Sequence, residues 1–274
     1  MNLSDFFTIL RFPWLSIVWV IASGFLTSAG ASLYLHRSVT HTAVKFVVGI
    51  EYIFRFWLWM ATGMNTREWV ACHRKHHAFA DKPGDPHSPV LEGLSAVLWG
   101  GVFLYRKAIK DPELIKKYGH GCPNDWIERN IFSKFRLGGI ALLIIINVLV
   151  WGLFWGAIAW SCQALWMIAL GHLINGAGHA VGYRNTEVKD SSTNIVRVGS
   201  VGLGEELHNN HHANMTSAKF SQKKNEYDPG WGIILVLTWL RLAKIKKYTI
   251  TKDVKWYGLR ILQFLGFKNA ANSV

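Results

Sequence analysis

The chain has 274 residues, half of them hydrophobic, and 17% of them are charged, against about 25% in an average soluble domain. The net charge is +13, yet the apolar residues form membrane-length runs, which argues against a nucleic-acid-binding protein. The three cysteines, Cys72, Cys122 and Cys162, are widely separated. This pattern supports neither a disulfide framework nor a thiolate zinc site.

Three hydrophobic stretches predict membrane helices. The first, about residues 14–35, follows a start without a basic region or a cleavage signature, so we interpret it as a retained span. The second, about residues 44–64, carries Glu51 and Arg55. The third runs over residues 137–183 without any Asp, Glu, Lys or Arg. Because one span needs about 20 apolar residues, it predicts two crossings, about 137–155 and 159–182.

The polar segments 66–136 and 183–274 carry most of the positive charge. Of the 30 Lys and Arg, 12 lie between residues 67 and 136 and 14 lie from residue 184 onward. The positive-inside rule therefore places both segments in the cytoplasm. Their basic side chains either lie beside anionic lipid or bind acidic substrate headgroups.

Nine of the twelve histidines sit in motifs with metal-ligand spacing. They form one HxxxxH, two HxxHH boxes and an Asn-x-x-x-His: His36 and His41; His73, His76 and His77; His208, His211 and His212; and His179. On a helix, positions i, i+3 and i+4 share a face, so each HxxHH is expected to offer three imidazoles to one point. In the HxxxxH, one histidine would ligate from the last helical turn and the other from the chain beyond. Imidazole suits iron, zinc and copper, and nine ligands suit two ions.

The histidine boxes also predict the topology. All ligands must lie on one side of the membrane, and the first two boxes flank residues 44–64. That stretch is therefore expected to be an interfacial helix, which an i to i+4 pair of Glu51 and Arg55 would fit. A true span there is the competing prediction. The fold class is an all-α integral membrane protein with one domain over residues 1–274, about three crossings and a cytoplasmic helical cap.

The remaining histidines are expected to be ordinary. His172 lies near the end of the last predicted span, where a buried hydrogen-bonding role is favoured. His87 and His120 lie in polar loops. His179 lies nearer the cytoplasmic end, where it can reach the metals.

At these motifs the sequence resembles the membrane fatty-acyl desaturases, in particular the acyl-CoA Δ9 branch. Beyond the boxes, the likeness rests on Asp85-Pro86-His87, on Arg106-Lys107, on Asn175-x-x-x-His179 and on Gly202-Leu-Gly-Glu205 before the third box. It covers roughly residues 35–247. Three features depart from the family: a single span before the first box, HRSVTH in place of an aromatic-rich box, and the lack of a haem-binding HPGG motif.

The resemblance implies that the nine histidines hold two Fe²⁺ ions, that Asn175 reaches one of them through a water, and that O2 is the co-substrate. It implies a fatty-acyl substrate, carried on CoA or on a lipid, whose headgroup Arg106 and Lys107 would face. Oxidising an alkyl chain requires a redox metal. The two electrons would come from a separate ferredoxin or b5-type cytochrome with its reductase.

Two alternatives fit the sequence less well. The same boxes would serve a diiron hydroxylase or ketolase. A metal transporter would instead place its ligands inside the spans, whereas most of these histidines lie outside them.

Overall fold

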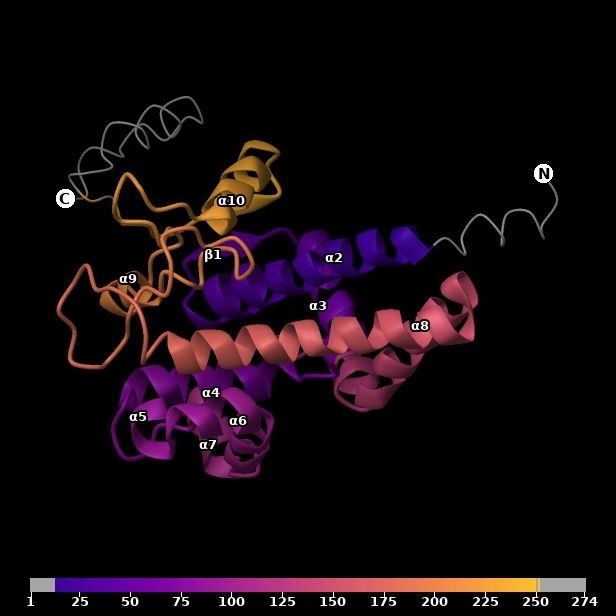
Figure 1. Cartoon of the computed structure of the whole chain (residues 1–274), viewed down its shortest axis with the longest axis horizontal. Helices are drawn as coiled ribbons and strands as arrows, with labels where there is room; N and C mark the ends of the chain where they lie inside the picture. Colours follow the sequence, from indigo (N-terminus) through magenta and orange to yellow (C-terminus); the bar gives the residue numbers. More distant parts are fainter. Residues whose placement is uncertain (1–12, 250, 252–274) are drawn as a thin grey trace.

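The computed structural model describes residues 13–249 and residue 251 (Figure 1). The first twelve residues and most of the end of the predicted 183–274 segment lie outside this part. The elements are α2 (Pro13–Ala29), the π-helix η1 (Gly30–Thr40), β1 (Val44–Phe46), α3 (Val48–Thr62), α4 (Thr66–Phe79), α5 (Pro89–Glu92), α6 (Leu94–Ala108), α7 (Pro112–Tyr118), the π-helix η2 (Glu128–Phe132), α8 (Arg136–Ala177), α9 (His208–Ala213), α10 (Pro229–Trp239) and β2 (Ala243–Ile245).

The fold is mostly helical, as predicted, but it is not purely α. Strand β1 pairs with β2 in an antiparallel two-stranded sheet, with Val44 opposite Ile245. The sheet joins the chain just after the first histidine box to a segment about 200 residues later. Such a long-range pair of three-residue strands leaves no periodic pattern that a sequence argument can detect.

Helix α2 continues directly into η1, and together residues Trp14–Thr40 are long and apolar enough to cross a membrane. The predicted first span falls within this unit. In η1 the hydrogen bonds run from i+5 to i, as between His41 N and His36 O at 3.1 Å. His36 therefore lies in the last π-turn and His41 caps it, which matches the expected arrangement of the HxxxxH.

Helix α8 folds back on itself at Gly152, whose φ is 77° and ψ is 169°. Asn147 donates a hydrogen bond to Gln163 at 3.0 Å, whereas 16 residues of straight helix would separate them by about 24 Å. The helix is thus a hairpin of two antiparallel parts, as the uncharged run predicted. It is the second unit with the length and apolarity to span a membrane, and only 22% of its most apolar window is buried.

Helix α3 covers the stretch predicted to be interfacial. Its 15 residues are fewer than the roughly 20 that a span needs. Arg55 does not form the expected ion pair with Glu51 but pairs with acidic residues of another segment. Arg55 is buried and binds Asp125 at 2.6 Å and Glu128 at 2.9 Å. Spacing within one helix favoured the local partner, but burial required carboxylates from a segment 70 residues away.

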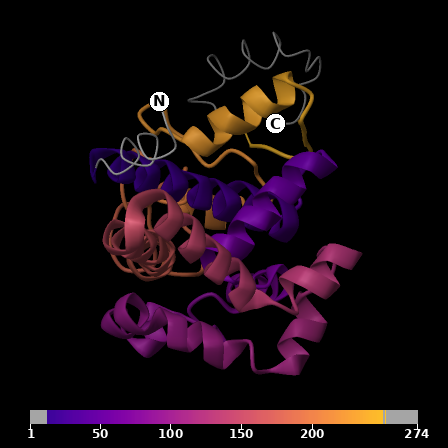
Figure 2. The ribbon, with the colours of Figure 1, turned by 90° about the vertical axis from the view of Figure 1, so that its right-hand side faces the viewer.

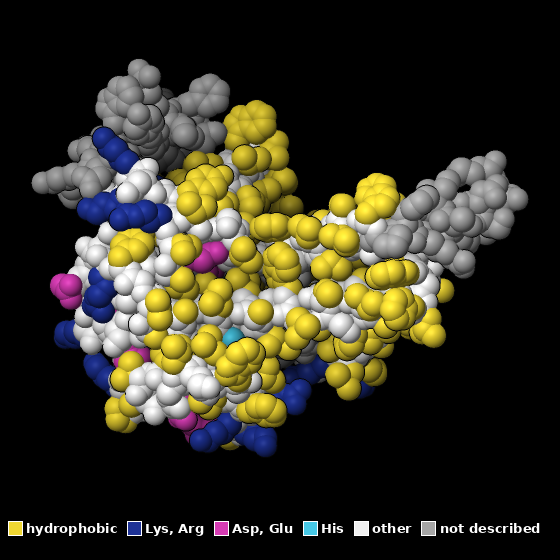
Figure 3. All heavy atoms as spheres, in the orientation of Figure 1, with side chains coloured by type: hydrophobic (Ala, Val, Ile, Leu, Met, Phe, Trp, Pro, Cys, Tyr) yellow, Lys and Arg dark blue, Asp and Glu magenta, His cyan; other side chains and the backbone are white. Residues whose placement is uncertain are grey.

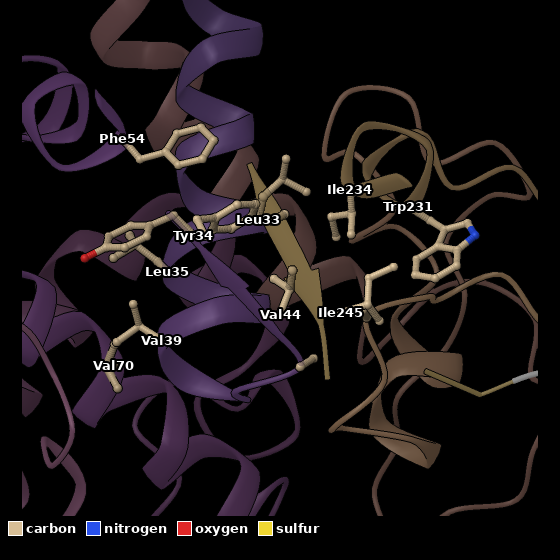
Figure 4. Close-up of a cluster of buried hydrophobic side chains, with 14 of the residues drawn as sticks. Leu33, Tyr34, Leu35, Val39, Val44, Phe54, Val70, Trp231, Ile234 and Ile245 are labelled. Carbon is tan, nitrogen blue, oxygen red and sulfur yellow. The ribbon is translucent and has the colours of Figure 1, made fainter. Parts of the chain in front are cut away.

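The helices form layers around α8, with an apolar arm and a buried core. Helices α4 to α7 form a layer on one side of α8, and α10 lies on the opposite side, beyond α2 (Figures 1 and 2). Apolar side chains cover the arm made by α2 and α8, and most Lys and Arg lie away from it (Figure 3). A buried cluster joins η1 and α3 to α10 and the sheet, with Leu33, Phe54, Ile234 and Ile245 among its members (Figure 4).

Candidate metal centre

All nine sequence-predicted histidines converge in the structure, in two groups. Within each group the potential ligand nitrogens lie within 4.8 Å of one another. The first group is His36, His41, His73, His77 and His211, and the second is His76, His179, His208 and His212. Seven of the nine are buried, and His41 and His77 are partly buried.

Helices α4 and α9 each supply histidines to both groups. His73 and His77 of α4 face the first group, and His76 faces the second. In α9, His211 faces the first group, and His208 and His212 face the second. The expectation that each HxxHH points at one metal is therefore wrong. Consecutive helical residues lie about 100° apart around the axis, whereas i and i+4 lie about 40° apart, so each box is divided.

Several ring nitrogens approach one another at ligand-to-ligand distances. The Nε2 atoms of His36 and His77 each lie 3.0 Å from that of His211, and the Nε2 atoms of His179 and His208 are 3.1 Å apart. Imidazole nitrogens about 2.1 Å from one ion and about 90° apart would lie about 3.0 Å from each other. The spacing fits a metal between the rings.

Four carboxylates hold the outer nitrogens of four of these rings. Nδ1 lies 2.6 Å from Glu205 in His36, 3.0 Å from Asp85 in His76, 2.8 Å from Asp81 in His179 and 3.1 Å from Asp190 in His212. An Nδ1–H bound to a carboxylate leaves Nε2 as a lone-pair donor and fixes the ring's orientation. All four rings thus direct Nε2 into the cluster.

Burial keeps six of these imidazoles neutral. Burial first, and neighbouring histidines second, hold the pKa of His41, His73, His77, His208, His211 and His212 well below the usual value. Neutral imidazole is the form that binds a metal. Within the described part of the chain, the buried Nε2 atoms of His41, His76 and His212 have no hydrogen-bond partner. Buried polar atoms are rarely left unpaired, so the donor set fits metal ions.

A cavity of about 500 Å³ adjoins the cluster. Its walls include His73, His87 and Asn175, so the predicted water-mediated ligand Asn175 lies beside the site. Arg106 lines the cavity, whereas Lys107 is exposed and is not part of the wall. The volume is in the range of ligand-binding pockets.

The other three histidines differ from one another. His172 shares a 2.7 Å hydrogen bond with the carbonyl of Leu98, in line with its expected role, and also lines the cavity. His120 contacts Arg74 at the surface. His87, expected to be an ordinary loop residue, is buried and stacks on His76 with ring centroids 4.6 Å apart. In the sequence, its position in Asp85-Pro86-His87, shortly after the second box, could have indicated that His87 lies near the metal centre.

Two long apolar helices and two buried histidine groups are together features of a membrane-bound metalloprotein. The sequence profile of the fatty acid desaturase family matches residues 12–222. The chain belongs to the fatty acid desaturase family. That family uses a diiron centre, and the buried histidine groups fit such a site.

Individual relatives give a finer comparison. The Delta-9 desaturase-like 3 protein of Arabidopsis thaliana is 32% identical over 248 residues, covering 85% of this chain and 77% of that protein. The sn-1 stearoyl-lipid 9-desaturase of Synechocystis is 30% identical over 241 residues, covering 83% and 69%. Delta-9 acyl-lipid desaturase 1 of Arabidopsis thaliana is 28% identical over 224 residues, covering 78% and 69%. The expected likeness to the acyl-CoA branch in particular is therefore not supported; these relatives are Δ9-like and in part acyl-lipid enzymes.

Proposed function

We propose that this protein introduces a cis double bond at the Δ9 position of a fatty-acyl chain esterified to a lipid. The observation that carries the proposal is the convergence of nine histidines into two groups beside an apolar cavity. The Δ9 position and the lipid carrier rest on the names of the relatives. An acyl-CoA substrate is the second candidate.

The nine histidines would hold one iron ion in each group, with Asn175 beside them. Bound iron supplies the O2-dependent oxidation that side chains alone cannot perform. The protein's part is to bind and orient. Four carboxylates orient four of the rings so that Nε2 points into the cluster and is free to bind a metal: Glu205, Asp85, Asp81 and Asp190.

The cavity would hold the acyl chain against this cluster and keep water out. Its apolar wall suits a hydrocarbon chain. Arg106 and Arg136 also line the wall and suit a charged or polar headgroup. Arg136 is already bound to Glu68 by two hydrogen bonds of 2.6 and 2.8 Å, so Arg106 is the free cation of this wall among the described residues.

Each turnover requires two electrons from outside the chain. A separate donor, a ferredoxin or a b5-type cytochrome with its reductase, would supply them. The cytoplasmic side is the proposed location of the cluster, because the basic segments border the predicted spans.

The test is expression in a host that lacks its own unsaturated fatty acids, followed by lipid analysis. The wild type should produce Δ9 cis alkenes, found on lipids within the first minutes of a labelled-acetate pulse. His76→Ala and His211→Ala should lose this activity and lower the iron content, whereas His120→Ala should retain both. Hydroxylated rather than unsaturated products, with full iron, would contradict the proposal. Alkenes formed first on acyl-CoA would favour the second candidate.

A further inference from the structure

The cavity beside the metal centre is walled mainly by one face of each of two helices. Along α8 the lining residues recur at helical spacing from Trp160 to Asn175, and along α6 from Val97 to Ile109. On α8, 15 residues correspond to about 22 Å of helix. The cavity therefore follows α8 from the metal centre toward the middle of the apolar hairpin.

The two parts of the cavity differ in chemistry. Along α8 the wall from Trp160 to Gly171 is apolar and includes Ala164 and Met167, whereas His172 and Asn175 lie at its metal end. The charged residues of the wall are Glu68 of α4, Arg106 near the end of α6 and Arg136 at the start of α8. A hydrocarbon end fits the first part, and a polar carrier fits the second. The methyl end of the substrate is thus assigned to the part along α8.

Gly171 lies in this apolar wall, one helical turn before Asn175. A Cβ built on Gly171 meets no heavy atom within 4 Å, so the residue borders open cavity space. Glycine in a helix interior is less favourable than alanine. The nearby glycines of α8 have packing reasons, because a Cβ on Gly139 would meet Trp59 at 2.4 Å and one on Gly176 would meet Leu98 at 3.0 Å. Gly171 has no such contact.

We infer that Gly171 determines the length of acyl chain that the enzyme accepts on the methyl side of the new double bond. The missing side chain leaves the path from the metal centre to Trp160 open for a long hydrocarbon chain. This inference rests on the proposed function. A side chain at residue 171 would fill the path close to the metals and admit only shorter chains.

The experiment compares Gly171→Leu with Gly100→Leu. Gly100 is also a helix-interior glycine, with no heavy atom within 4 Å of its ideal Cβ, but it does not line the cavity. Cells that lack unsaturated fatty acids are fed a series of saturated acids. Their chains run from roughly 12 to 18 carbons and differ by about two carbons from one acid to the next. Purified protein is assayed for iron, and total lipids for chain length of the alkenes.

In Gly171→Leu, the ratio of short-chain to long-chain alkenes should rise by about tenfold or more, with iron equal to that of the wild type. Gly100→Leu should keep the wild-type ratio. An unchanged ratio in Gly171→Leu, or an equal change in both variants, would overturn the inference. If Gly171→Leu fails to accumulate, Gly171→Ala decides: a shift toward shorter chains supports the inference and no shift overturns it. A wild type without alkenes would instead refute the proposed function.

Discussion

At the scale of single residues, Glu205 connects the metal centre to a buried charge network. One of its oxygens lies 2.6 Å from His36 Nδ1, and the other accepts a hydrogen bond from Ser32 at 2.6 Å. Arg37 lies 3.4 Å from Glu205 and 3.1 Å from Asp228 and is fully buried. The negative charges of Glu205 and Asp228 thus face the positive charge of Arg37, and Glu205 also orients the ring of His36.

We expect Glu205→Gln to lower iron affinity by about 10- to 100-fold. The amide has the size of the carboxylate but loses the charge that orients His36 and balances Arg37. Iron retained per chain after dialysis against graded chelator concentrations measures the effect. Glu113→Gln is the control, because Glu113 forms an exposed pair with Lys116. Equal iron retention in the two variants would contradict a role for Glu205 in holding His36.

The histidines that converge in the two groups could be predicted from sequence, whereas their carboxylate partners could not. Spacing identifies HxxHH because its members share one helix. Asp81 and Asp190 reach His179 and His212 from loops, and no spacing relates an acid to a ring that is 22 or 98 residues away. Glu205 and Asp85 were noticed only as parts of family-like motifs, without a role.

At the scale of secondary-structure elements, α4 and α9 bring five histidines with lowered pKa into the core: His73, His77, His208, His211 and His212. In the unfolded chain these rings would titrate near 6.5. Below that pH the unfolded state binds protons that the folded state does not, so the free energy of unfolding decreases as the pH falls. The stabilising contribution is therefore complete above pH 6.5 and lost below it.

The melting temperature of the iron-free protein should accordingly decrease as the pH falls from about 7.5 to about 5.5, a range that brackets the histidine pKa of about 6.5. Thermal unfolding in detergent measures this. The double variant His73→Gln, His211→Gln removes two of the titrating rings and should show a shallower decline. A melting temperature that does not change over this range would contradict the burial of neutral histidines.

The α8 hairpin is held to α2 by a chain of buried hydrogen bonds. Trp19 donates to Asn147 at 2.9 Å, Asn147 to Gln163 at 3.0 Å, and Gln163 to Ser23 at 2.8 Å. Such bonds between apolar helices each contribute about 1 kcal/mol. Asn147→Leu should therefore destabilise the fold by about 1 kcal/mol or more, because it leaves Trp19 Nε1 without its acceptor and Gln163 Oε1 without its donor.

Unfolding in detergent with increasing denaturant tests this prediction, with Leu149→Asn, on the exposed side of the same helix, as the comparison. The further change Gln163→Leu should restore part of the lost stability, since it removes one unpaired amide. If the double variant is less stable than Asn147→Leu alone, the hydrogen bonds do not hold the hairpin.

Sequence patterns predicted the long helices better than the contacts between them. The uncharged run indicated the hairpin, since 47 residues without charge are long enough for two spans of about 20 residues joined by a turn. The position of the reversal at Gly152 and the partner of Arg55 were not predictable, because they depend on side chains from distant segments. The β1–β2 pair was missed for the same reason.

At the scale of the whole molecule, apolar and basic surfaces lie apart. Exposed apolar side chains of α2 and α8 form the arm in Figure 3, while Lys and Arg gather around the end that carries α4 to α7. The first part of α8 leads away from that end, and the second part returns to it after Gly152. In a membrane, the turn at Gly152 and the histidine end would therefore face opposite sides.

Cysteine labelling tests this orientation. With the three native cysteines replaced by serine, Lys110→Cys places a thiol on the exposed surface of the histidine end, and Leu153→Cys places one beside the turn, where the native side chain is 76% exposed. A membrane-impermeant maleimide added to intact cells should label Leu153→Cys. It should label Lys110→Cys only after permeabilisation, because basic segments stay in the cytoplasm. Labelling of Lys110→Cys in intact cells would reverse the orientation, and labelling of both from one side would mean that α8 does not cross the membrane.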